Sequence, residues 1–61
     1  MKAIKCRLLC FTRWGYECES SKHQSIKEAV ELAKELCEDD YAFSYEIFSE
    51  DGTKLLKRGI K

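Results

Sequence analysis

Four short strand-like stretches surround one stretch with an apolar stripe at helical spacing, and this order restricts the fold of the chain more than any other feature. Side chains of a strand alternate between two faces, whereas a helix brings every third or fourth residue to one side. The order is therefore strand, strand, helix, strand, strand. One helix packed on one face of a four-stranded antiparallel sheet is the simplest way to bury these apolar faces.

Residues 3–12 and 16–20 are predicted to form a hairpin around the loop Arg13–Gly15. Both stretches alternate, and a three-residue loop that ends in a left-handed glycine is common between paired strands. This register places Cys10 opposite Cys18. Together with these two cysteines, the core face of the hairpin should contain Ile4, Cys6, Leu8, Thr12 and Tyr16.

A helix is predicted to follow the polar link at residues 20–25. Ser25 and Glu28 have the spacing of a capping box, in which the serine caps the helix and the glutamate reaches back. The apolar stripe consists of Ile26, Ala29, Val30, Ala33, Leu36 and Cys37. The helix should end near residues 38–40, where three acidic side chains oppose the helix macrodipole.

The second hairpin is predicted from residues 41–49, which alternate, and from the Asp-Gly pair that follows them, a strong signal for a two-residue turn. This register pairs Phe48 with Leu55 and Glu46 with Lys57. The core face should then contain Phe43, Ile47, Leu56 and Ile60, with Tyr41 and Tyr45 pointing the same way.

The predicted fold class is α+β, a ββαββ arrangement in a single domain that covers residues 1–61. The first and third strands are the longest and most apolar, so we place them in the centre of the sheet. The strand order 2-1-3-4 keeps all neighbouring strands antiparallel, and the crossover through the helix should be right-handed.

The size and charge of the chain argue against catalysis. A domain of 61 residues buries roughly 60% of the surface of its unfolded chain, so the core is thin and a deep cleft is not expected. The formal net charge is zero, which argues against strong non-specific binding to nucleic acid. His23 has no serine or cysteine at a suitable spacing in the sequence. We predict a protein that is not an enzyme and that needs neither a cofactor nor a metal.

Four cysteines are compatible with buried reduced thiols, a disulfide or a metal site: Cys6, Cys10, Cys18 and Cys37. Their spacings do not match the paired motifs of zinc sites, and we expect neither a signal peptide nor a membrane-spanning stretch. We therefore expect reduced thiols that pack as small apolar side chains in a cytoplasmic protein.

One helix covers one face of the sheet, and the opposite face carries more apolar side chains than a solvated face needs. The Trp14 hairpin loop lies beside this face. The predicted partner-binding residues are Arg7, Leu9, Phe11, Arg13, Trp14, Phe48, Leu55 and Lys57. Three interpretations remain open: long Lys and Arg stems cover the patch, a protein (including a second copy of the chain) binds it, or single-stranded nucleic acid stacks on its aromatic rings.

The neutral net charge conceals two regions of opposite charge. The first strand and the C-terminal hairpin are basic, whereas the outer surface of the helix is acidic. The acidic helix surface consists of Glu31, Glu35, Glu38, Asp39 and Asp40. Such a surface is either simply solvated or complementary to a basic partner.

The basic first strand Lys2–Arg7, the acidic helix Ser25–Asp40 and the hairpin Glu50–Leu55 resemble those of small ββαββ proteins encoded by phages and other mobile elements. This resemblance implies a protein that inhibits a host defence enzyme by binding it, frequently as a homodimer. It assigns no role to individual residues. The expected function is a non-enzymatic protein-binding module without affinity for membranes, and the alternative is a binder of single-stranded nucleic acid.

Overall fold

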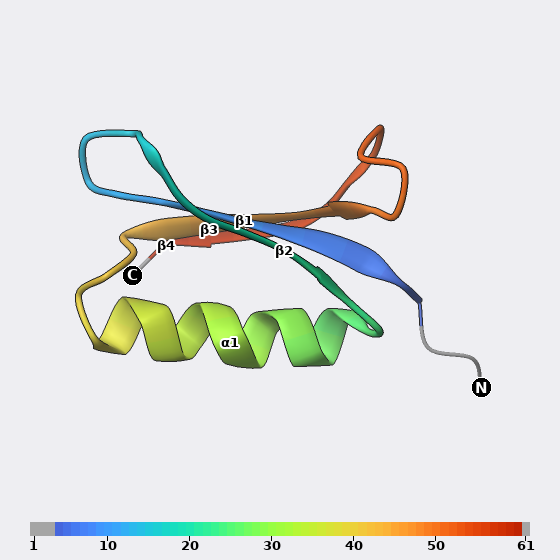
Figure 1. Ribbon diagram of the computed structural model, residues 1–61, viewed down its shortest axis with the longest axis horizontal. Coiled ribbons are helices and arrows are strands. Elements are labelled where there is room, and N and C mark those ends of the chain that lie inside the picture. The colour runs from blue at the N-terminus through green and yellow to red at the C-terminus, as the bar shows by residue number, and fades with distance from the viewer. Residues whose placement is uncertain (1–3, 61) are drawn as a thin grey trace.

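The computed structural model describes residues 4–60, which form four strands and one helix. The elements are β1 (Cys6–Phe11), β2 (Glu17–His23), α1 (Ile26–Glu38), β3 (Ser44–Ser49) and β4 (Leu55–Ile60). The strands form one antiparallel sheet in the order β2-β1-β3-β4, and α1 lies along one face while the other face stays uncovered (Figure 1). The predicted ββαββ fold and strand order are therefore confirmed.

Parts of the predicted basic regions, Lys2, Ala3 and Lys61, lie outside the described residues. Among residues 4–60 there is no helix with the length and apolarity that a membrane crossing needs.

The core lies between α1 and the sheet, and its position follows from the predicted periodicities. β1 contributes alternate residues, and α1 contributes residues spaced by four. The buried side chains are Cys6, Leu8, Cys10, Ala29, Ala33, Cys37, Ala42, Tyr45 and Ile47. Ile4, which was predicted to face inward, is exposed because it precedes the start of β1 at Cys6.

Both ends of α1 are closed by local hydrogen bonds. The Ser25 hydroxyl accepts a hydrogen bond from the Glu28 N–H at 3.1 Å, as the capping pattern predicts. At the other end Asp40 has a φ of 59°, and its N–H donates to the Cys37 carbonyl while the Tyr41 N–H donates to the Leu36 carbonyl. This pair of bonds is a Schellman motif, which stops the helix within the predicted residues.

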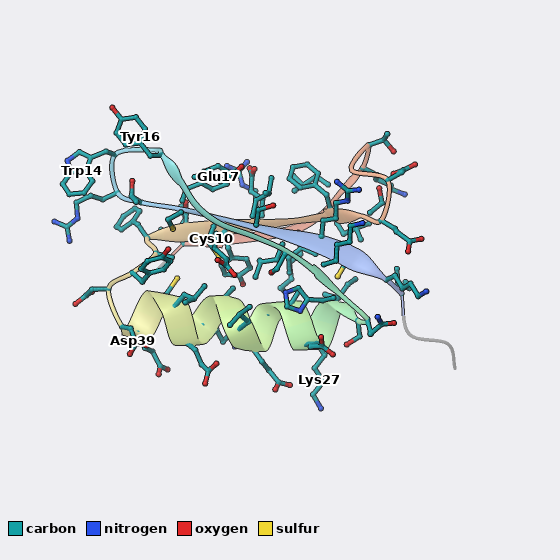
Figure 2. The ribbon with its side chains drawn as sticks, in the orientation of Figure 1. Cys10, Trp14, Tyr16, Glu17, Lys27 and Asp39 are labelled. Atoms are coloured by element: carbon teal, nitrogen blue, oxygen red, sulfur yellow. The ribbon has the colours of Figure 1, made fainter. Side chains whose placement is uncertain are left out.

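A β-bulge in the first hairpin changes the predicted register. The Thr12 N–H donates to the Tyr16 carbonyl at 2.8 Å, but Cys10 pairs with Glu19 because Cys18 is an extra residue on β2. The prediction that Cys10 lies opposite Cys18 is therefore wrong. Tyr16 is also not in the core: its ring projects from the hairpin, away from α1 (Figure 2). The predicted polar link is shorter than expected, because β2 continues to His23.

A second bulge shifts the other hairpin. Phe48 pairs with Leu55 as predicted, but Ile47 then pairs with Lys57 because the strand carries one extra residue. A shift by one residue moves each side chain to the opposite face. Lys57 therefore lies on the face of the sheet that α1 covers. Arg58, and not Lys57 as predicted, lies opposite Glu46, and the Arg58 Nη2 is 3.9 Å from the Glu46 Oε2.

The connection from α1 to β3 corrects the predicted core on the C-terminal side. The strand begins at Ser44, so Tyr41 and Phe43 belong to the connection, where both are exposed and Ala42 takes the buried position. Ile60 pairs with Ser44 rather than with Phe43, and it is 71% exposed at the end of β4.

Candidate functional site

Four exposed aromatic side chains gather at one end of the molecule. The β1–β2 loop supplies Trp14 and Tyr16, and the connection from α1 to β3 supplies Tyr41 and Phe43. These two segments lie at the same end of the sheet (Figure 1), and Figure 2 shows the rings of Trp14 and Tyr16 pointing into solvent there. Trp14 is 75% exposed, Tyr16 72%, Tyr41 53% and Phe43 40%. We call these four residues the aromatic end.

A pocket of about 390 Å³ opens between the two segments of the aromatic end. Its walls are formed by Thr12, Arg13, Trp14, Cys18, Asp40, Tyr41, Ala42 and Phe43. Its volume falls within the range of small-ligand sites, and it is large enough to admit one long side chain. The pocket thus combines three aromatic residues with one cation and one carboxylate.

Hydrogen bonds hold the walls of this pocket in place. The Tyr41 hydroxyl donates to the Cys18 carbonyl at 2.7 Å, which ties the connection to β2. The Phe43 N–H donates to the Phe11 carbonyl at 2.7 Å, which ties the same connection to β1. Within the hairpin loop, Gly15 takes a φ of 88° and its N–H donates to the Thr12 carbonyl. These bonds order the pocket walls in the free protein, so less conformational entropy is lost on binding.

Charges around the aromatic end are mainly negative. The Arg13 guanidinium carbon lies 5.9 Å from the centre of the Trp14 ring, a cation–π distance. Asp40 lines the pocket, and Asp39 follows directly after the last turn of α1 at the same end (Figure 2). Glu17 begins β2 immediately after the hairpin loop. Asp40 therefore shares the pocket lining with Arg13, Asp39 lies at the same end of α1, and Glu17 pairs with Phe11 on the face of the sheet opposite α1.

The open face of the sheet holds most of the residues that the sequence assigns to it. Their cross-strand pairs put Arg7, Leu9, Phe11, Phe48 and Leu55 on the face opposite α1. Leu9, Phe11 and Phe48 are only half-exposed, and Leu55 is exposed. Because the Arg7 Nε donates to the Glu50 carbonyl at 2.8 Å, its stem is held against this face.

Lys57 does not lie on the open face, because the bulge in the second hairpin places it on the face that α1 covers. It lines a pocket beside α1 together with Ile26, Val30 and Lys34. Arg13 and Trp14, also predicted partner residues, lie at the aromatic end instead. The eight predicted partner-binding residues are therefore divided among three places on the molecule.

The five residues of the predicted acidic helix surface are all exposed, but they are not one site. Glu31 and Glu35 lie along the middle of α1. Glu38, Asp39 and Asp40 lie at its C-terminal end, next to the aromatic end. Asp40 lines the pocket of the aromatic end, whereas Glu31 lines a separate pocket with Ile26 and Val30.

A Ser–His–Glu relay connects β2 to α1, contrary to the expectation from sequence spacing. The Ser21 Oγ lies 2.7 Å from the His23 Nε2, and the His23 Nδ1 lies 3.1 Å from the Glu28 Oε1. This connectivity resembles that of acyl-transfer enzymes, which also need a substrate pocket and oxyanion donors. The pockets that we describe among residues 4–60 are lined by other side chains. The relay joins the end of β2 to the first turn of α1.

All four cysteines are free thiols, and three of them are buried. Burial raises the pKa of Cys10 to about 12, with smaller contributions from Cys18, Cys37 and Glu19. Burial is also the main cause that raises the pKa of Cys6. Since the thiolate is the reactive form, these thiols are poor nucleophiles near neutral pH. No group of three or more His, Cys, Asp or Glu residues within residues 4–60 is arranged to hold a metal ion.

No protein-family model, curated protein or solved structure matches the chain. The functional proposal therefore rests on the geometry of the aromatic end. Sequence reasoning identified Trp14 but missed Tyr16, Tyr41 and Phe43, because it counted these three as core residues. The predicted helix end near residues 38–40 could have indicated that Tyr41 and Phe43 lie outside the core. A chain that leaves a helix needs a short connection before it can enter a strand.

Proposed function

We propose that the chain is a non-enzymatic protein-binding module whose partner contacts the aromatic end. The observation that carries this proposal is the gathering of the only tryptophan, two of the three tyrosines and one of the three phenylalanines at one end, all exposed. Aromatic residues contribute much of the binding energy at protein interfaces, and here they are exposed and cluster around a pocket. The open face, whose apolar side chains are mostly half-exposed, is the less favourable surface.

The biological role in this proposal follows the sequence resemblance. We infer that the partner is a host defence enzyme, inhibited by occlusion, and that the protein acts in the cytoplasm. Free thiols at all four cysteines support a reducing compartment. A second copy of the chain is the alternative occupant of the aromatic end. Light scattering would then report a dimer for the wild type and a monomer for Trp14→Ala, whereas a wild-type monomer at high concentration would contradict the dimer.

Affinity capture from the native host tests the proposal. Three forms of the chain are compared: the wild type, the double variant Trp14→Ala/Phe43→Ala, and Leu55→Ala as a matched control. Leu55 is an exposed apolar residue at the start of β4, after the hairpin turn at the other end of the sheet (Figure 1). We expect the wild type and the control to capture the same partner and the double variant to lose it. Capture by the double variant at wild-type level would contradict the proposal, provided that circular dichroism shows it folded.

A single-stranded nucleic acid is the second candidate partner. The bulge in β4 brings Arg58 to the open face, where Arg7, Phe11 and Phe48 also lie, and cations beside aromatic rings suit such a ligand. Arg7 already donates to the Glu50 carbonyl, however, and Arg58 forms an ion pair with the Glu46 carboxylate. This candidate predicts salt-sensitive binding of single-stranded DNA or RNA that weakens in Arg7→Ala and Phe11→Ala. Absence of binding at low salt would exclude it.

A further inference from the structure

The walls of the pocket at the aromatic end are suited to a cation. Trp14, Tyr41 and Phe43 line it, and the face of an aromatic ring carries the negative part of its quadrupole. A neutral apolar ligand would use such walls equally well. The charges around the pocket therefore decide which class of side chain fits it.

Those charges favour a positive ligand. Asp40 lines the pocket, and Asp39 precedes it at the same end of α1. The cation in the lining is Arg13. Carboxylates at the end of α1, beside an aromatic pocket, attract basic side chains and repel acidic ones.

The end of α1 gives a separate reason. The carbonyl end of a helix carries a partial negative charge, which cations stabilise and anions destabilise. The last turn of α1 contains no basic residue, and acidic residues occupy positions 38–40. Glu38 and Asp39 therefore lie at the negative end of the helix, where a positive partner group would be stabilised.

Arg13 shows that the Trp14 ring accepts a cation in these surroundings. Its guanidinium carbon lies 5.9 Å from the centre of that ring. A guanidinium or ammonium group of a partner can stack on the other face of the ring or displace Arg13, whose side chain is exposed. Displacement would make Arg13 a competitor of the incoming side chain.

Resting on the proposed function, we infer that the pocket of the aromatic end receives a basic side chain, arginine or lysine, from the protein partner. The ring faces of Trp14, Tyr41 and Phe43 hold its charged group. The carboxylates at the end of α1 supply the opposite charge.

Titration with short blocked peptides of equal length tests this inference. The peptides alternate glycine with arginine, with lysine or with glutamate. Because Trp14 is the only tryptophan, its fluorescence reports on the pocket directly. We expect the arginine and lysine peptides to change Trp14 emission in a saturable way and the glutamate peptide to leave it unchanged.

Variants locate the binding. Phe43→Ala should weaken binding of the arginine peptide by about threefold to thirtyfold, the range of a partly desolvated cation–π contact. Asp39→Asn should weaken it by more than about twofold, because it removes a charge at the end of α1. Glu31→Gln is the matched control, since it removes the same charge from α1 about 12 Å away along the helix. Its affinity should stay within about twofold of the wild type. Equal weakening by Asp39→Asn and Glu31→Gln would overturn the inference, because it would indicate general attraction to an acidic helix.

Arg13→Ala distinguishes a basic ligand from an acidic one. If the pocket holds a cation, removal of the competing guanidinium leaves the affinity for the arginine peptide unchanged or raises it. Binding of the glutamate peptide that disappears in Arg13→Ala would overturn the inference.

The outcome also separates this inference from the proposed function. If none of the peptides binds while partner capture still requires Trp14 and Phe43, the inference of a basic side chain is wrong and the proposed protein-binding function stands. If the arginine peptide binds at Trp14 but the double variant captures the partner as well as the wild type does, the inference about the pocket is confirmed and the proposed function is wrong.

Discussion

Gly59 is a position at which an added side chain would clash with the core. It pairs with Tyr45 across β3 and β4, and the Tyr45 ring lies over its backbone. A Cβ added at Gly59 would lie 2.5 Å from the Tyr45 Cζ. Because Tyr45 is buried against α1, its ring has little room to move. We expect Gly59→Ala to lower the free energy of unfolding by about 1–3 kcal/mol, measured by urea denaturation.

A double-mutant cycle checks the cause of this effect. In the background Tyr45→Leu, which removes the ring, Gly59→Ala should be less destabilising than in the wild type. An equal loss in both backgrounds would show that the strain arises elsewhere on β4.

Asp51 makes the β3–β4 turn sensitive to acid. Its Oδ1 accepts hydrogen bonds from the Ser49 hydroxyl at 2.6 Å and from both the hydroxyl and the N–H of Thr53. These bonds, that from Ser49 first, lower the pKa of Asp51 from 3.8 to about 2. A carboxylate whose pKa is lower in the folded chain stabilises it above the unfolded value, and this contribution disappears as pH falls through about 2.

We therefore expect Asp51→Ala to be less stable than the wild type at neutral pH, with the difference shrinking as the pH approaches 2. Thermal unfolding of both forms over this pH range measures it. A difference that stays constant with pH would mean that the turn does not depend on the charge of Asp51.

At the scale of the elements, the acidic residues at the end of α1 lower the stability of the helix but favour binding of a basic ligand. Asp39→Lys would place a positive charge at the negative end of the helix, one turn after Glu35. We expect a gain of about 0.3–1 kcal/mol in the free energy of unfolding and weaker binding of the arginine peptide. Glu31→Lys in the middle of the helix should change both quantities less. A loss of stability in Asp39→Lys would contradict the electrostatic account.

The elements themselves could be predicted from the sequence, because periodicity and caps are local. The buried set Cys6, Leu8 and Cys10, the cap at Ser25 and the strand order all follow from them. The registers beyond the two bulges could not be predicted, since an extra residue in one strand leaves the alternation intact on both sides. This is why Lys57 was placed on the wrong face.

At the scale of the whole molecule, the aromatic end exists only in the folded chain. Trp14 and Phe43 are 29 positions apart in the sequence, and the pairing of β1 with β3 brings their segments together. Sequence reasoning placed Phe43 in the core because an aromatic residue at an alternating position usually lies there. Three of the four residues of the aromatic end were therefore missed, and only Trp14 was identified from the sequence.

Amide NMR of the labelled chain, titrated with its captured partner, tests the central claim most directly. The account predicts that the largest shifts and broadening fall on residues 12–16 and 40–43. Residues of the open face, such as Leu9 and Phe48, and of the middle of α1, such as Glu31, should change little. Shifts centred on either of those surfaces, with 12–16 and 40–43 unmoved, would contradict it.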